Sequence, residues 1–127
     1  MHDAPSPSEL ITSVKRFIDD AAAPQLTGHA AFHARVASNV LATLLRELEQ
    51  RPAAEHGEAE RLRKILGATP DATVQEMNRD LCKRILDGRV DAATPGLFQH
   101  LKTTTIDQLS IDQPNYSGLE AARSRLG

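Results

Sequence analysis

The fold class is indicated most clearly by the stretch FHARVASNVLATLLREL, residues 32–48. Its apolar residues return on one side of a helix at about 100° per residue. They are Val36, Ala37, Val40, Leu41, Leu44 and Leu48. We therefore expect a long helix from about residue 29 to 50, whose apolar stripe packs against other helices. Pro52 follows, and proline in a helix interior predicts a break there.

Four more helices are predicted on either side of this one. Two begin at capping boxes, Ser6–Glu9 and Thr73–Glu76, in which a hydroxyl and a carboxylate satisfy the first amides of a helix. Gly67 and Gly88 suit left-handed C-terminal caps. The expected additional helices cover residues 7–20, 53–66, 74–87 and 95–113. Thr103–Thr105 is a β-branched run that lowers helix propensity, so we expect the last helix to bend or fray there.

These segments predict an all-α protein. No part of the chain alternates at period two for long enough to indicate a strand. The connections are short, which favours antiparallel neighbours in a compact bundle of about five helices without a sheet. At 127 residues we expect one domain over residues 1–127, with a flexible N-terminus at 1–6 and a tail at 115–127.

Composition argues against several classes of partner. The net charge is −2 and aromatic residues make up 3% of the chain, so it lacks the basic face and stacking surface that nucleic acids require. No apolar run approaches the roughly 20 residues that span a bilayer, and the N-terminus lacks the pattern of a signal peptide. The single Cys82 suits a reducing compartment. We expect a cytoplasmic protein without a membrane or nucleic-acid partner.

Catalytic chemistry is not indicated by any motif. His29 and His33 have the i, i+4 spacing of zinc ligands, but the glutamate of a zinc-protease helix and a third ligand are both missing. Cys82 lies near Leu81 and Ile85, so we expect a buried thiol. The chain has neither a nucleophile elbow nor a phosphate-binding glycine loop. We predict no catalytic residue, no cofactor and no metal site.

The candidate functional residues lie beside the apolar stripe of residues 32–48. Arg35, Asn39 and Arg46 share one helical face next to that stripe. Arginine is favoured at interfaces for its forked donors, so this polar strip, with His33, is a candidate partner-binding site. An intramolecular network that holds a loop or the tail is the alternative, and for His33 a hydrogen-bonded position at the core edge.

Several of these stretches together resemble a known family. They are Pro7–Glu9 with Leu10 and Val14, residues 32–48, Leu66–Gly67, Ile85–Gly88 and Pro114–Tyr116. The last is similar to an Asn-Pro-x-Tyr close in which Gln113 replaces the asparagine. The family is a small helical bacterial domain of unknown function, typically encoded beside aminoglycoside-phosphotransferase-like kinases and acyl-CoA dehydrogenases.

The resemblance implies a noncatalytic companion subunit. The family is similar to the small subunit of kinases that phosphorylate 4-hydroxyacyl-CoA thioesters in levulinate-type catabolism. ATP and magnesium chemistry would then belong to a phosphotransferase-like kinase partner, and no catalytic residue is carried over. Two alternatives stay open: a self-contained helical module that binds an acyl or CoA group, and a homo-oligomeric structural or regulatory protein.

Overall fold

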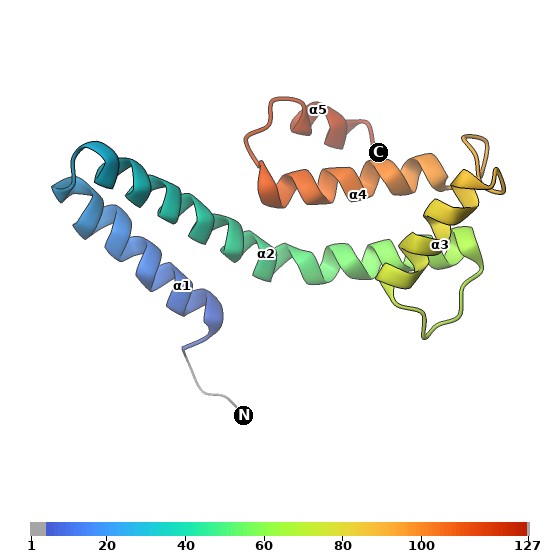
Figure 1. Ribbon diagram of the computed structural model, residues 1–127, viewed down its shortest axis with the longest axis horizontal. Coiled ribbons are helices and arrows are strands. Elements are labelled where there is room, and N and C mark those ends of the chain that lie inside the picture. Colours follow the sequence, from blue (N-terminus) through green and yellow to red (C-terminus); the bar gives the residue numbers. More distant parts are fainter. Residues whose placement is uncertain (1–4, 127) are drawn as a thin grey trace. The chain divides into compact units, whose positions relative to one another are not determined.

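The computed structural model describes residues 5–126 and contains five α-helices (Figure 1). No strand occurs within residues 5–126, so the predicted all-α class is confirmed. The chain divides into two compact units, Met1–Glu49 and Gln50–Gly127, which are described in turn. Most of the flexible N-terminus predicted at residues 1–6 lies outside the described residues, and Ser6 is the N-cap of the first helix. The single-domain assignment stays a prediction.

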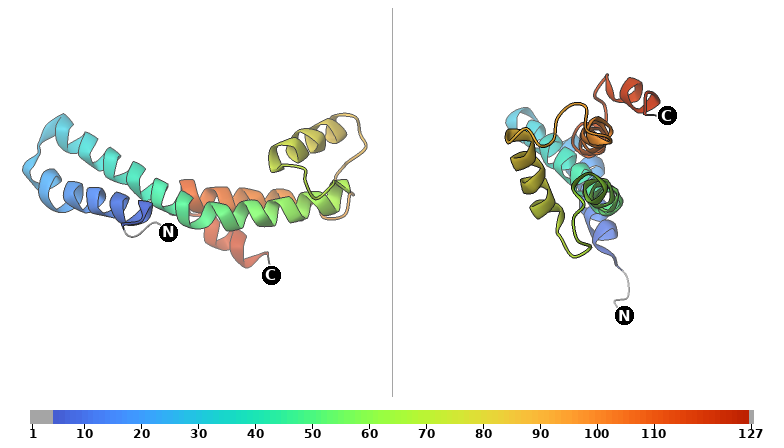
Figure 2. Two further views of the ribbon diagram at one scale, coloured as in Figure 1. Left: turned by 90° about the horizontal axis from the view of Figure 1, so that it is seen from below. Right: turned by 90° about the vertical axis from the view of Figure 1, so that its right-hand side faces the viewer.

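The first unit is a helical hairpin. Helix α1 (Pro7–Arg16) begins at the predicted capping box, where Ser6 and Glu9 exchange hydrogen bonds of 3.2 and 2.6 Å. It continues as a π-helical turn, η1 (Phe17–Ala22), and a short 3-10 turn, η2 (Ala23–Gln25). The chain then reverses, and the first part of α2 (Gly28–Leu66) runs back beside α1 (Figures 1 and 2).

A seam of small and medium-sized side chains joins the two helices of this hairpin. The less exposed residues recur at alternating spacings of three and four, the spacing with which paired helices keep one side in contact. On α1 and η1 they are Ser8, Ile11, Lys15, Ile18 and Ala22; on α2 they are Ala31, Ala34, Ser38, Leu41 and Leu45. Ser38 alone is buried among the described residues of this unit, so the seam is narrow.

The predicted break at Pro52 is wrong. Helix α2 runs without interruption over 39 residues and contains Pro52 in its interior. The proline removes the amide that would bond to the Leu48 carbonyl, a cost of roughly 3 kcal/mol. Both residues are exposed, so water can satisfy that carbonyl. Packing of α2 residues on either side of the proline offsets the cost, and the helices expected at 29–50 and 53–66 are one.

The second unit contains the hydrophobic core. It consists of the second part of α2 with α3 (Val74–Leu86), α4 (Leu97–Asp112) and α5 (Leu119–Ser124). Helix α4 runs antiparallel beside α2, and α5 folds back along α4 (Figures 1 and 2). Its main core cluster comprises Ala59, Leu62, Leu66, Met77, Leu81, Val90 and Leu97. The predicted capping box at Thr73 and Glu76 opens α3.

Helix α4 differs from its prediction in two respects. It begins after Gly96 in the left-handed conformation, because the Thr94 hydroxyl is instead engaged with the loop at Asp91. The threonine run does not interrupt it, since the Thr105 hydroxyl bonds back to the Leu101 carbonyl at 2.8 Å. Phe98, near the start of the helix, is 74% exposed. The tail predicted at 115–127 contains the short helix α5.

Candidate functional site

The predicted strip residues do not share one environment. Arg35 and Asn39 are exposed on α2, and within residues 5–126 neither side chain has a polar partner. Arg46 is half-buried and donates a 3.0 Å hydrogen bond to the Thr43 hydroxyl, so it is already engaged. His33 is exposed and its ring meets Phe32 edge-on, with ring centroids 5.6 Å apart. The core-edge alternative for His33 is therefore wrong.

Helical periodicity divides the hairpin into two sides. At about 100° per residue, with α1 and α2 antiparallel across their seam, Arg35, Asn39 and Arg46 project to one side. Arg16 and Asp19 of the first helical arm fall on the same side. We call these five residues the polar side of the hairpin. His33 falls toward the opposite side.

A hydrogen-bonded triad supports the polar side from within the seam. Ser38 donates to Asp19 at 2.5 Å, and Asp19 also accepts from Lys15 at 2.5 Å. The hydrogen bonds from Lys15 and Ser38 lower the pKa of the Asp19 carboxyl. The ionised carboxylate therefore joins η1 to α2 close to the backbone that carries Arg35 and Asn39.

The opposite side of the hairpin is apolar and exposed. The same periodicity places six large apolar residues there, and we call them the apolar side. They are Leu10 (54% exposed), Val14 (52%), Phe17 (63%), Val40 (54%), Leu44 (45%) and Leu48 (46%). Scattered exposed apolar residues are ordinary on a monomer, but a contiguous group of this size marks an interaction surface.

The expectation that the stripe of residues 36–48 forms the core is thus only partly correct. Leu41 is half-buried in the seam, whereas Val36, Val40, Leu44 and Leu48 are exposed. Leu10, Val14 and Phe17 of α1 belong to the same exposed side, a role that was not predicted from the sequence. The sequence does contain a sign of this exposed side. Together, the two helices carry more apolar residues than the single seam between them can bury.

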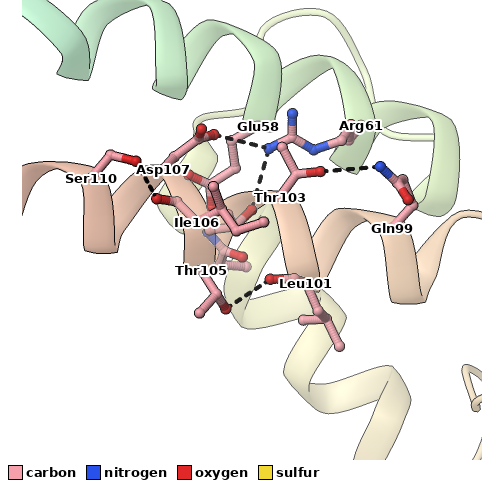
Figure 3. A network of polar contacts seen from close by, with 11 residues as sticks. Glu58, Arg61, Gln99, Leu101, Thr103, Thr105, Ile106, Asp107 and Ser110 are labelled. Atoms are coloured by element: carbon pink, nitrogen blue, oxygen red, sulfur yellow. Dashed lines mark hydrogen bonds and ion pairs between the residues drawn. The ribbon is translucent and has the colours of Figure 1, made fainter. Parts of the chain in front are cut away.

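The second unit holds a polar network between α2 and α4 (Figure 3). Arg61 on α2 donates to the Thr104 hydroxyl at 3.3 Å and lies 3.9 Å from the Asp107 carboxylate. Glu58, one turn earlier on α2, accepts a 2.8 Å hydrogen bond from Asn78 on α3. Asn78 therefore forms a hydrogen bond between α3 and α2. These contacts fasten three helices together.

His100 lies buried in the same unit, with 2% of its surface exposed. Its Nδ1 has no hydrogen-bond partner within the described part of the chain. Burial lowers the pKa of the imidazole, the positive charge of Arg61 lowers it further, and Glu58 acts in the opposite direction. A neutral imidazole enclosed in this way contributes to the packing of α4 and is closed to substrates in solution.

Helix α3 carries an open groove of about 530 Å³ on its outer face, lined by residues that include Asn78, Arg79, Cys82 and Lys83. Cys82 is exposed, so the expected buried thiol is wrong. Leu81, the preceding residue, is the one that faces the core. Within residues 5–126 no carboxylate or imidazole is hydrogen-bonded to Cys82, although Asp87 also lines the groove, so no activated nucleophile–base pair is formed there.

Two further features are absent from residues 5–126. No group of three or more histidine, cysteine, aspartate or glutamate side chains is arranged to hold a metal ion there. Nor does any helix in this range combine the length and the hydropathy needed to cross a membrane.

Residues 24–116 match the family described as Domain of unknown function (DUF6285), and the chain belongs to this family. The matched range includes residues 32–48 and ends at Tyr116. Helix α1 and its capping box at Ser6 lie before it. No curated protein and no solved structure matches the chain.

Proposed function

We propose that this chain is a noncatalytic, cytoplasmic accessory subunit that binds and supports a phosphotransferase-fold kinase. The kinase would act on hydroxyacyl-CoA thioesters and supply the ATP and magnesium chemistry itself. This substrate class rests on the family resemblance set out from the sequence.

The observation that carries the proposal is the state of Arg35 and Asn39. An intramolecular network was the alternative for these residues, yet among residues 5–126 neither side chain finds a polar partner. Asp19 and Ser38 hold the adjacent backbone, so the two side chains are presented from a rigid element. Because the backbone is already ordered, complex formation has to restrict only the side chains, which lowers the entropic cost of binding.

Arg35 and Arg46 give the polar side a chemistry that suits a protein partner. A guanidinium forms forked hydrogen bonds with a carboxylate or with backbone carbonyls. Arginine is among the residues that contribute most binding energy at interfaces. We expect the kinase to offer acceptors at this contact.

The test begins with the tagged full-length chain purified from its native host. A phosphotransferase-fold kinase recovered in a near-integral ratio supports the proposal, and its activity on hydroxyacyl-CoA thioesters should depend on the chain. Arg35→Ala combined with Asn39→Ala should lower the affinity for that kinase while the melting temperature stays close to that of the wild type, because both side chains are exposed. Arg79→Ala combined with Arg125→Ala is the matched control, because both of these arginines are exposed in the second unit.

Two results would reject the proposal. One is a kinase that neither co-purifies with the chain nor responds to its addition. The other is a double variant that loses binding only because its fold is lost, which would make the strip a structural element.

A further inference from the structure

We infer that the apolar side of the hairpin pairs with the apolar side of a second copy of this chain, so that two hairpins complete a four-helix bundle. The inference is independent of the kinase proposal, since it concerns the opposite side of the hairpin and would hold for any function of the protein.

The first argument is the hydrophobic surface that the hairpin leaves in water. Within residues 5–49 no large apolar residue is buried, while the six residues of the apolar side are between 45% and 63% exposed. A helix normally buries one apolar stripe, and here α1 and α2 each carry a second one beyond the seam. Two helices with apolar stripes on the same side form half of an antiparallel four-helix bundle.

The second argument is that the apolar side of one copy can pack against the apolar side of another copy. Helical periodicity places no aspartate, glutamate, lysine or arginine of residues 7–48 among its six members, although His33 lies between Val40 and Leu44. Glu47 lies at its edge, about 20° beyond Val40, and already has an interaction within the chain. A two-fold interface brings each residue near its own counterparts, so an ionised group there would meet a like charge. A charged partner would find no complementary group on this side, whereas an identical neutral side fits.

The third argument is register. The hydrogen bond from Ser38 to Asp19 aligns the two antiparallel helices. Val14 precedes Asp19 by five residues, so it comes level with the part of α2 about five residues after Ser38, between Val40 and Leu44. The apolar side is therefore continuous across both helices at mid-length. A two-fold axis through this point would pack each Val14 against apolar residues of the other copy.

The fourth argument is area. Two packed helices are about 20 Å wide, and the paired segment of α2, residues 31–48, is about 26 Å long at 1.5 Å per residue. The contact therefore covers about 500 Å² in projection on each copy. Two copies together reach the roughly 1,000 Å² that a specific interface needs, before the corrugation of the surfaces is counted.

The test is the mass of the purified full-length chain in solution, measured by light scattering and by sedimentation over a range of concentrations. We expect twice the monomer mass of 13.8 kDa. Val14→Glu and Leu44→Glu should each raise the dimer dissociation constant about 30-fold or more, because the interface contains each new charge twice. Thr12→Glu is the matched control: it adds the same charge at an exposed position on α1 that faces the polar side, and the dimer should persist.

A monomeric wild-type chain at high micromolar concentration overturns the inference. So does a dimer that survives both Val14→Glu and Leu44→Glu, since it would use another surface. Far-ultraviolet circular dichroism shows whether the glutamate variants keep their helices. If either unfolds, Val40→Thr takes its place, because it preserves the side-chain shape, and it should weaken the dimer in the same direction.

Discussion

The hydroxyl of Ser38 on α2 donates a 2.5 Å hydrogen bond to the carboxylate of Asp19 in η1. This contact is the polar centre of a seam whose other members are mostly alanine and aliphatic side chains. Because the seam buries little apolar surface, directional bonds of this kind carry an unusual share of the specificity of the hairpin.

Ser38→Ala should therefore destabilise the protein by about 1 kcal/mol, the usual net contribution of one protein hydrogen bond. Thermal unfolding followed by circular dichroism measures the change. Ser13→Ala is the control, since Ser13 is exposed on α1 and its hydroxyl makes no hydrogen bond with the described residues. An equal loss in both variants would mean that the Ser38 bond adds nothing specific.

Pro52→Ala should raise the free energy of unfolding by about 1–3 kcal/mol. The substitution restores an amide for the Leu48 carbonyl and removes the steric conflict of a proline ring inside α2. Chemical denaturation gives the change directly. Pro70→Ala should act in the opposite direction by up to about 1 kcal/mol, because Pro70 lies in the turn after α2 and there limits the freedom of the unfolded chain. A lower stability for Pro52→Ala would contradict the argument.

Stability should fall in mild acid because of His100. The pKa of an unfolded histidine is about 6.5, and that of the buried imidazole is lower. Between these two values the unfolded state binds more protons than the folded state. The contribution of His100 is therefore fully present above about pH 6.5 and is lost as the pH falls toward the folded pKa.

Denaturation curves at pH 7.5 and pH 5.5 test this expectation. His100→Gln should reduce the difference in free energy of unfolding between the two pH values. His56→Gln should leave that difference unchanged, since the His56 side chain is 77% exposed. The same difference in the wild type and in His100→Gln would place the acid sensitivity elsewhere.

Local signals in the sequence predicted local structure well. The capping boxes at Ser6 and Thr73 open α1 and α3 as expected, because all of their hydrogen bonds join residues three apart. Pro52 misled the prediction because its penalty is also local, whereas the compensating contacts are spread along α2 and come from two different units.

Burial was predicted less well, for a physical reason. Periodicity identifies which residues share one side of a helix, but not what covers that side. Val40 and Leu44 have the pattern of core residues and are exposed. Arg61 and Thr104 form a contact between helices that are distant in the sequence, and no spacing rule links them. The strip of Arg35, Asn39 and Arg46 could be predicted because its residues lie on one helix, and its role as a partner-binding site stays a prediction.

The two sides of the hairpin should be separable by mutation. Leu44→Glu should give a monomer whose Arg35 and Asn39 are still presented on the polar side, so kinase binding should weaken much less than dimerisation. Arg35→Ala should do the reverse and leave a dimer with reduced affinity for the kinase. Measuring mass and kinase affinity for both variants gives a two-by-two comparison. If each variant lowers both quantities by the same factor, the two sides act as one interface, and the assignment of separate partners to them is wrong.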